Sequence, residues 1–317
     1  MTGFLSLFRR LTASFLAFYF ILVTFSMKPA PIEPLDRENL KLDLALISDA
    51  HTEGNNKNRF DVNSVCFKNL EGAKDDLDAL VLLGDLTMNG YEGEYLFFYG
   101  MMERVNPIRP YFPIIGNHDV GNSTEADFDK YRSRSLGFLQ TFVDKDIDQL
   151  YYSKVVNGYH LIFLAPDAAE SPARKLSDEQ LDWFESELDA AAESGLPIFV
   201  FNHYPYYYMD DDCEDRYVGL LNKYDDIFVI VGHMHYYMRT SVIPGDKRTP
   251  EIWVPCVTML DEDNEPYEAT GRGYFMEVYP DSVEFRAFNF YTDEFIDWSA
   301  SYALREEYDD RLPAIGW

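Results

Sequence analysis

The stretch Tyr111-Phe-Pro-Ile-Ile-Gly-Asn-His-Asp119 joins an apolar run to four residues of a very different kind. The run over 111–115 has the length and composition of a strand that is buried on both faces of a sheet. Gly116 allows a tight turn at the end of this strand, and an amide, an imidazole and a carboxylate follow in a row. The stretch therefore predicts a buried strand whose carboxyl end carries groups that bind cations or transfer protons.

The same arrangement recurs at four other apolar runs, which predict strands over 42–48, 79–83, 197–202 and 227–231. The polar residues at their ends are Asp49 and His51, then Asp85, then Asn202 and His203, and finally His233 and His235. In an open α/β sheet, ligands bind beyond the carboxyl ends of the strands. Five of the six histidines of the chain fall at these ends, whereas core histidines would be scattered. The pattern predicts one binding edge built from five strands.

Amphipathic helical patterns separate the predicted strands, and a further strand is predicted over 159–165. The clearest helix begins with Ser177-Asp-Glu-Gln180, which has the form of a capping box, and ends before Gly195. After Glu251 the pattern becomes β-like, over 251–257, 274–279 and 282–289. Strands that alternate with helices and then give way to a β-rich end indicate an α/β fold. We expect a single catalytic domain over 38–317, preceded by a Pro-rich linker over 31–37.

The chain is strongly acidic, with 27 Lys and Arg against 55 Asp and Glu and a formal net charge of −28 at pH 7. This balance argues against the backbone of DNA or RNA as a partner. It also argues against attraction to anionic lipid headgroups. A phosphate-bearing substrate would therefore need a local positive charge, which bound metal ions at the predicted edge would supply.

Each motif at this edge has an ordinary structural interpretation when it is taken singly. Asp-x-His and Gly-Asp often only form turns, and a single histidine such as His203 is more often a hydrogen-bonded core residue. Together they offer carboxylate, imidazole and amide oxygen without thiolate, a donor set that favours manganese, iron or zinc. Two such ions about 3.5–4 Å apart, bridged by a carboxylate, are suited to in-line displacement at phosphorus.

The motif set resembles the calcineurin-like metallophosphoesterase superfamily over about 42–239. The matching motifs are Asp49-x-His51, Gly84-Asp85, Gly116-Asn117-His118-Asp119, His203 and Gly232-His233-x-His235. The resemblance implies a four-layer α-β-β-α sandwich of two mixed sheets flanked by helices. It also implies a ligand set, in which Asp49, His51 and His235 hold the first metal, Asn117, His203 and His233 hold the second, and Asp85 bridges them.

The resemblance further implies how the reaction proceeds. A hydroxide shared by the two metals would be the nucleophile. His118 would contact the phosphate and protonate the leaving alkoxide, and Asp119 would orient its imidazole, as expected of a positioned general acid.

Other residues narrow the resemblance to one branch of the superfamily. Phosphoprotein phosphatases have Glu where Asp119 stands, and purple acid phosphatases have a ligand Tyr where Met88 stands and Gly where His51 stands. The stretch Gly84-Asp-Leu-Thr-x-x-Gly90 followed by Glu94-Tyr95 is instead similar to the class III cyclic-nucleotide phosphodiesterase-like branch. This implies hydrolysis of a small phosphodiester, such as a cyclic nucleotide or a lipid or nucleotide diester. The alternatives are a phosphomonoesterase, a nucleotide or sugar-nucleotide pyrophosphatase, and, more distantly, a non-catalytic metal-binding scaffold.

The first thirty residues differ from the rest of the chain. Arg9 and Arg10 precede an apolar run over 11–27, and three prolines then end any helix. This pattern predicts a secretory signal peptide or a signal anchor over 1–30, with the catalytic domain outside the cytoplasm and membrane contact through this segment only. Whether the segment is cleaved stays open. The alternative is an amphipathic helix that is buried against the domain.

Cysteines and tyrosines allow no comparable conclusion about function. The three cysteines, Cys66, Cys213 and Cys256, show no CxxC spacing, and one pair of them would suffice for a disulfide. Tyrosines follow His203 (204–208) and His235 (236–237), where they would stack a nucleobase or an aryl group or, as we prefer, simply pack the loops. The number of subunits is not encoded in any motif.

Overall fold

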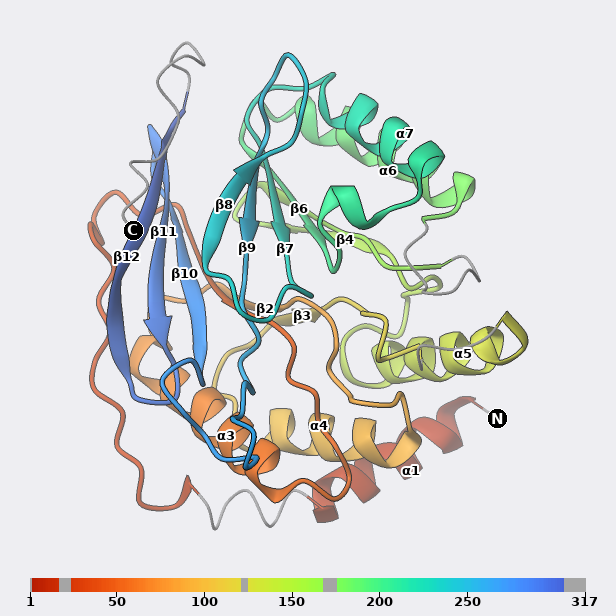
Figure 1. Ribbon diagram of the computed structural model, residues 1–317, viewed down its shortest axis with the longest axis vertical. Coiled ribbons are helices and arrows are strands. Elements are labelled where there is room, and N and C mark those ends of the chain that lie inside the picture. Colours follow the sequence, from red (N-terminus) through yellow and green to blue (C-terminus); the bar gives the residue numbers. More distant parts are fainter. Residues whose placement is uncertain (1, 17–23, 121–124, 168–175, 305–317) are drawn as a thin grey trace.

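Two six-stranded sheets face each other at the centre of the molecule, and helices cover their outer faces (Figure 1). The computed structural model describes residues 2–16, 24–120, 125–167 and 176–304. Both sheets are mixed, because each combines a block of parallel strands with antiparallel strands beside it. The predicted α-β-β-α sandwich of two mixed sheets is confirmed.

The first sheet has the order β12-β11-β10-β1-β2-β3. Strands β1, β2 and β3 form its parallel half, with β3 at the edge, and β10, β11 and β12 form an antiparallel meander on the other side of β1. Every residue of β1 is buried, as expected of a strand covered on both faces. The strands are β1 (Leu42–Ile47), β2 (Ala79–Leu82), β3 (Tyr111–Pro113), β10 (Arg272–Val278), β11 (Ser282–Asn289) and β12 (Glu294–Ala303).

The second sheet has the order β4-β5-β6-β7-β9-β8. Four neighbouring strands, β5, β6, β7 and β9, are parallel, and the two edge strands run antiparallel to them. The strands are β4 (Tyr152–Val156), β5 (Tyr159–Phe163), β6 (Ile198–Asn202), β7 (Ile227–Val231), β8 (Arg239–Val242) and β9 (Pro250–Trp253).

Helices enclose two apolar cores. The larger core fills the space between the sheets, where Phe163 and Phe201 stack at 5.1 Å and Phe228 meets Phe285 of the other sheet at 6.4 Å. The smaller core lies beneath α6 and α7. The helices are α1 (Thr2–Leu16), α3 (Lys57–Asn69), η1 (Leu70–Ala73), α4 (Glu92–Arg104), α5 (Glu125–Phe142), α6 (Asp178–Ala192), η2 (Tyr206–Tyr208) and α7 (Asp211–Leu221).

The sequence pattern predicts the buried strands and misses the exposed ones. Strands 227–231 and 282–289 appear with the expected bounds, and the other expected strands appear with bounds shifted by one to four residues. The missed strands are β4, β8 and β12, which are only partly buried and mix polar with apolar residues. Helix α6 begins where expected, and Ser177 accepts a hydrogen bond from the Gln180 amide. The Gln180 side chain does not complete the capping box, because it pairs with both backbone groups of Ala165.

Helix α1 packs against α4 and α5 (Figure 1). The Arg9 guanidinium is buried, donates to Glu92 at 2.9 Å and lies 4.2 Å from the centre of the Phe138 ring. Ala13 is buried against Gly100 of α4. None of the helices described has the length and apolar character needed to cross a membrane. Part of the predicted apolar run, 17–23, lies outside the described residues, as does the end of the predicted domain, 305–317.

Two glycines of α4 provide a matched test of the α1 contact. A Cβ atom added at Gly100 would lie 2.5 Å from the Ala13 carbonyl oxygen, whereas one added at Gly93 would meet nothing within 4 Å. Gly100→Ala should displace α1 and accelerate tryptic cleavage within 1–30 by roughly tenfold or more. Gly93→Ala should leave cleavage unchanged and stabilise the protein by up to about 1 kcal/mol, because alanine restricts the unfolded chain. Equal cleavage of the two variants in timed proteolysis would contradict this packing.

Candidate metal centre

The predicted edge is assembled from five loops that follow parallel strands of the two sheets. Asp49 and His51 follow β1, Asp85 follows β2, and Asn117 and His118 follow β3 in the first sheet. His203 directly follows β6, and His233 and His235 follow β7 in the second sheet. Hydrogen bonds between loops tie the two halves together: the Val257 amide donates to the Ser48 carbonyl oxygen at 2.9 Å, and the His233 amide donates to Asp49 Oδ2 at 3.1 Å. Both sheets therefore contribute donor atoms to one place.

Five of these residues have a left-handed backbone. The φ angles are 55° at Asp49, 40° at His51, 49° at Asp85, 64° at His233 and 35° at His235. Such conformations cost a non-glycine residue of the order of 1–3 kcal/mol each and persist where the surrounding structure enforces them. Five predicted ligand residues have this backbone conformation. The left-handed turns therefore direct the ligand side chains toward one another, and the backbone strain lowers the stability of the fold.

The first group of donors consists of Asp49, His51, Asp85 and His235, whose ligand atoms lie within 4.8 Å of one another. His235 Nε2 is 3.0 Å from Asp49 Oδ1 and 3.0 Å from His51 Nε2. Asp85 Oδ2 is 3.9 Å from His51 Nε2. Three of these residues are the predicted ligands of the first metal, and the fourth is the predicted bridge.

The second group consists of Asp85, His203 and His233, again with ligand atoms within 4.8 Å of one another. His203 Nε2 lies 3.3 Å from Asp85 Oδ2 and 3.2 Å from Asn117 Oδ1. Asp85 therefore belongs to both groups, which is the position that a bridging carboxylate requires. Gly116 makes this possible, because a Cβ atom there would clash with Asp85 Oδ1.

The donor set fits a pair of divalent cations. Asp49 Oδ1 and Asp85 Oδ2 are buried and have no hydrogen bond of regular geometry. A buried carboxylate oxygen that accepts no hydrogen bond is costly. In addition, the Nε2 atoms of His51 and His235 face each other at 3.0 Å, as expected of two donors directed at one ion. Oxygen and imidazole donors of this kind suit manganese, iron and zinc.

The imidazoles determine the ionisation of these carboxyl groups. Burial favours the neutral acid, but the positive charge of His203 outweighs it and lowers the pKa of Asp85 to about 2. His235 likewise holds the pKa of Asp49 well below its ordinary value, against the effect of burial. Burial works against charge on His203 as well, yet Asp85 raises the pKa of His203 to about 9. Without metal, the centre therefore retains a proton on His203 at pH 7.

His118 lies at the rim of this centre, and its surroundings correct one prediction. Its ring meets His51 edge-on at 4.7 Å, and its backbone amide donates to Asp85 Oδ1 at 2.8 Å. We expected Asp119 to orient the imidazole, but His118 Nδ1 lies 2.7 Å from the Met88 carbonyl oxygen instead. The Asp119 carboxylate accepts hydrogen bonds from the amides of Gly116, Leu86 and Thr87 and from the Thr87 hydroxyl. Asp119 thus clamps the loop after β2 to the loop after β3.

Several residues around the centre were not predicted. Cys256 Sγ and Thr258 Oγ1 donate to the Asp49 carbonyl oxygen at 3.1 and 3.2 Å, and they hold the strained turn at that residue. The rings of Tyr204 and Tyr208 pack edge-on against His233, with centroids 4.6 and 5.0 Å away. Tyr204 and Tyr208 therefore pack against a predicted ligand, whereas Tyr207 is exposed, so packing of the whole run of tyrosines stays a prediction. Cys256 and Thr258 lie outside the motifs, so no sequence signal marks them.

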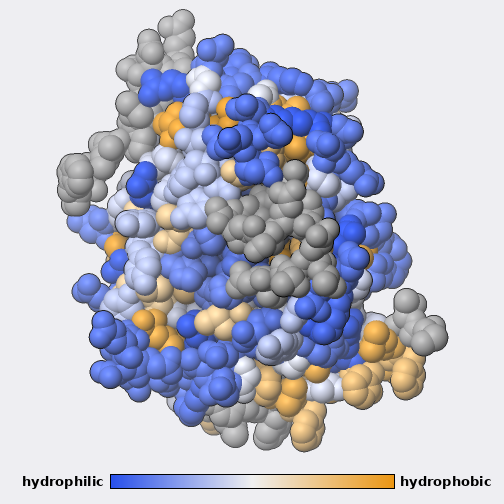
Figure 2. Space-filling view, turned by 45° about the vertical axis from the view of Figure 1, so that its right-hand side comes forward, coloured by the Kyte–Doolittle hydropathy of each residue, from blue (hydrophilic) through white to orange (hydrophobic). Residues whose placement is uncertain are grey.

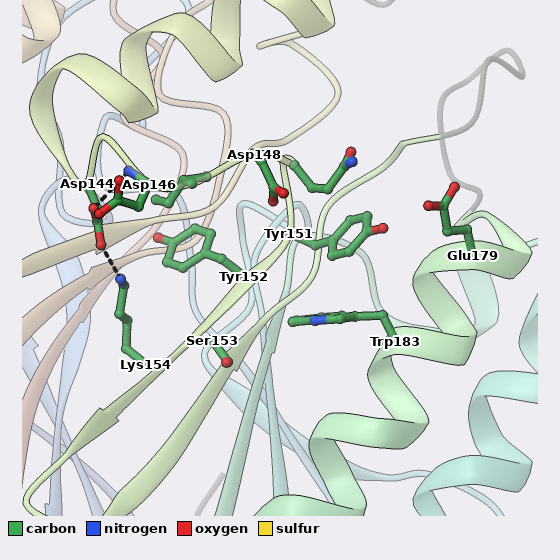
Figure 3. Close-up of a pocket in the computed structure, with 11 residues that line it drawn as sticks. Asp144, Asp146, Asp148, Tyr151, Tyr152, Ser153, Lys154, Glu179 and Trp183 are labelled. Carbon is green, nitrogen blue, oxygen red and sulfur yellow. Dashed lines mark hydrogen bonds and ion pairs between the residues drawn. The ribbon is translucent and has the colours of Figure 1, made fainter.

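A separate pocket of about 520 Å³ lies between the α5–β4 connection and α6 (Figure 3). Asp148, Tyr151 and Trp183 line it, and the two rings pack against each other with centroids 4.8 Å apart. None of the nine predicted site residues lines this pocket. The metal centre and this pocket are therefore distinct features.

Asp85→Asn tests the bridging position. Because an amide is a poorer ligand than a carboxylate and Asp85 serves both groups, the variant should lose occupancy of both cations. Asn117→Ala is the matched control, since Asn117 lies beside His203 of the second group and should affect one cation. The two variants are distinguished by their metal content after dialysis against limiting manganese, which inductively coupled plasma mass spectrometry measures. Two full equivalents in Asp85→Asn would remove it as the bridge.

The His203 proton predicts the pH dependence of the metal-free protein. The pKa of His203 is about 9 in the fold, above the ordinary 6.5. The stability that this proton contributes is therefore complete below about pH 6.5 and is lost as the pH rises to 9. The melting temperature of chelator-treated protein should fall over this window.

Manganese affinity should rise over the same window by up to about tenfold per pH unit, since one proton must leave. Calorimetry in buffers of different ionisation enthalpy detects that proton. An affinity independent of pH would contradict a protonated His203.

Comparison with known proteins agrees with this geometry. A family model described as calcineurin-like phosphoesterase matches residues 42–237, which include all nine predicted site residues. A probable glycerophosphodiester phosphodiesterase from Arcobacter nitrofigilis is 24% identical over 207 residues, covering 60% of this chain and 70% of that protein.

Two other relatives are described as probable cyclic nucleotide phosphodiesterases. The one from Rhodococcus erythropolis is 29% identical over 168 residues, covering 50% of this chain and 52% of that protein. The one from Fibrobacter succinogenes is 30% identical over 172 residues, covering 53% of this chain and 59% of that protein. The family model matches more than half of the length of this chain. The chain therefore belongs to the calcineurin-like phosphoesterases and is a hydrolase of phosphoric ester bonds.

Proposed function

We propose that this protein hydrolyses a small phosphodiester at the centre built around Asp85. The observation that carries the proposal is the sharing of Asp85 by two groups of donors, with His118 at their rim. Three relatives described as probable phosphodiesterases, for glycerophosphodiesters or cyclic nucleotides, support a diester over a monoester.

Two bound cations would supply a Lewis acid for the phosphoryl oxygens and an acidified water. The chain itself fixes where they bind, because Asp49 and Asp85 are fully buried and ionised. Two cations held by Asp49 and Asp85 would also concentrate positive charge at one place in a protein whose net charge is −28. A diester, with one negative charge, meets less repulsion from such a chain than a doubly charged monoester does.

His118 is suited to deliver a proton to the leaving oxygen. Its Nδ1–H donates to the Met88 carbonyl oxygen, which fixes the ring and leaves Nε2 as the free nitrogen. The residue is partly exposed, unlike the buried His51 and His203, so a substrate can reach it. In this role Nε2 carries the proton to the leaving alkoxide, and the Met88 carbonyl stabilises the imidazolium.

The metals and the cellular location are also part of the proposal. Manganese, iron or zinc is supported by the oxygen and nitrogen donors of the two groups. Burial raises the pKa of the Cys256 thiol, which favours its role as a donor to Asp49 over that of a thiolate ligand. Location outside the cytoplasm, as a secreted or membrane-anchored protein, is supported by the basic and apolar pattern of residues 1–30.

His118→Ala tests the proton donor. Turnover of an alkyl diester should fall by about 10²–10⁴, the usual contribution of a general acid. Metal content should remain near that of the parent protein, because the imidazole of His118 belongs to neither donor group. A substrate with p-nitrophenol as leaving group needs little protonation and should be affected less. Equal losses on both substrates would remove His118 as the acid.

Bis(p-nitrophenyl) phosphate and p-nitrophenyl phosphate test the substrate class. After removal of metal and reloading with manganese, we expect a kcat/KM for the diester that exceeds that for the monoester by at least about tenfold. A preference for the monoester would reassign the protein as a phosphatase. Activity on pyrophosphate bonds only would favour a pyrophosphatase.

A further inference from the structure

Helix α1 presents its apolar side chains to the outside. Phe4, Phe8, Leu11 and Phe15 are spaced by four, three and four residues, so they form one stripe along the helix. Their exposed fractions are 79%, 57%, 63% and 82%. In the space-filling view, hydrophobic residues gather at the lower edge of the molecule, where α1 lies (Figure 2).

The face of α1 that contacts the domain has the opposite character. Arg9 and Ala13 are its buried residues, and the half-buried ones beside them are polar except for Leu16 at the end of the helix: Ser6, Thr12, Ser14 and Leu16. An ordinary surface helix buries its apolar face and exposes its polar one. The polarity of α1 is therefore inverted, and an exposed apolar stripe of this kind marks a surface that something apolar covers.

The docking of α1 is built into the fold. Two glycines, Gly100 of α4 and Gly137 of α5, leave room for the Ala13 carbonyl and the Arg9 guanidinium, which any side chain would displace. Arg9 is paired with Glu92, and Arg10 donates to the Thr141 carbonyl oxygen. Both cations of the helix are thus engaged with the domain, and the outward stripe carries no charge.

We propose that the outward stripe of α1 lies in the interface of a lipid bilayer and holds the catalytic domain against the membrane surface. The sequence that follows, Ala-Phe-Tyr-Phe-Ile-Leu-Val over 17–23, is uncharged and continues the apolar character. Phe25, beyond it, is 85% exposed. A helix with Phe and Leu along one face is of the kind that inserts its apolar side among lipid headgroups.

Charge favours a lipid surface over a second copy of this chain. Each copy has a net charge of −28, so pairing of two copies is opposed by repulsion, which a neutral bilayer does not exert. The same charge predicts that binding depends on apolar contact rather than on anionic lipid. Neutral phosphatidylcholine vesicles should therefore bind the protein at least as well as vesicles with phosphatidylglycerol at low salt.

Vesicle flotation of the full chain tests the proposal. The parent protein should float with phosphatidylcholine vesicles, also in 0.5 M salt, and Phe4→Ser/Phe8→Ser should reduce the bound fraction by tenfold or more. These two residues precede the apolar run over 11–27 and are exposed, so the variant should keep its melting temperature and its activity on a soluble diester. Leu35→Ser/Val155→Ser is the matched control, since both side chains are exposed elsewhere, and it should float like the parent.

Three outcomes would overturn the proposal. The first is that the parent protein does not float with vesicles. The second is that Phe4→Ser/Phe8→Ser floats as fully as the parent, which would mean that the apolar run over 11–27 suffices by itself. Alternatively, light scattering without lipid shows a dimer that the same substitutions dissociate, which would assign the stripe to a second copy.

Discussion

The structure is organised around two ionised carboxylates that are fully removed from water. Asp49 and Asp85 lie between imidazoles at the junction of the two sheets, and one oxygen of each has no regular hydrogen bond. Water cannot solvate this charge, so positive charge beside it, from protonated imidazoles or from bound cations, must compensate it. The left-handed turns at five ligand residues and the glycine before Asn117 all serve to bring donors from both sheets to these two oxygens. The strained turns lower the stability of the loops, and in return the donor atoms already lie close together in the protein alone.

The same constraint explains how an acidic protein acts on an acidic substrate. With a net charge of −28, the chain as a whole repels phosphate esters. The attraction is confined to the place where two buried carboxylates fix cations, and the rest of the surface opposes anionic competitors. His118 stands at the boundary between this centre and solvent, and its Nε2 atom is the nitrogen left for a substrate because Met88 engages Nδ1.

Much of this arrangement could be predicted from the sequence because buried parallel strands leave a strong pattern. Apolar runs such as Ile227–Val231 end abruptly in polar residues, which predicts the binding edge. The resemblance of these motifs to a known family implied two donor groups that share Asp85, and the structure brings such groups together. What failed depends on contacts that the order of residues does not encode. β12 mixes exposed positions with half-buried and buried ones, Asp119 turns toward the amides of another loop, and Cys256 supports Asp49 from more than two hundred residues away. Gly100 and Gly137 lie in different helices with no motif around them, and only the fold brings both beneath α1.

The most direct test of the central claim is anomalous diffraction from crystals of the manganese-loaded protein. A dinuclear centre should give two anomalous peaks about 3.5–4 Å apart, with the Asp85 carboxylate between them. One peak would be bounded by Asp49, His51 and His235, and the other by Asn117, His203 and His233. A single peak, or two peaks of which only one contacts Asp85, would contradict a dinuclear centre built on that residue.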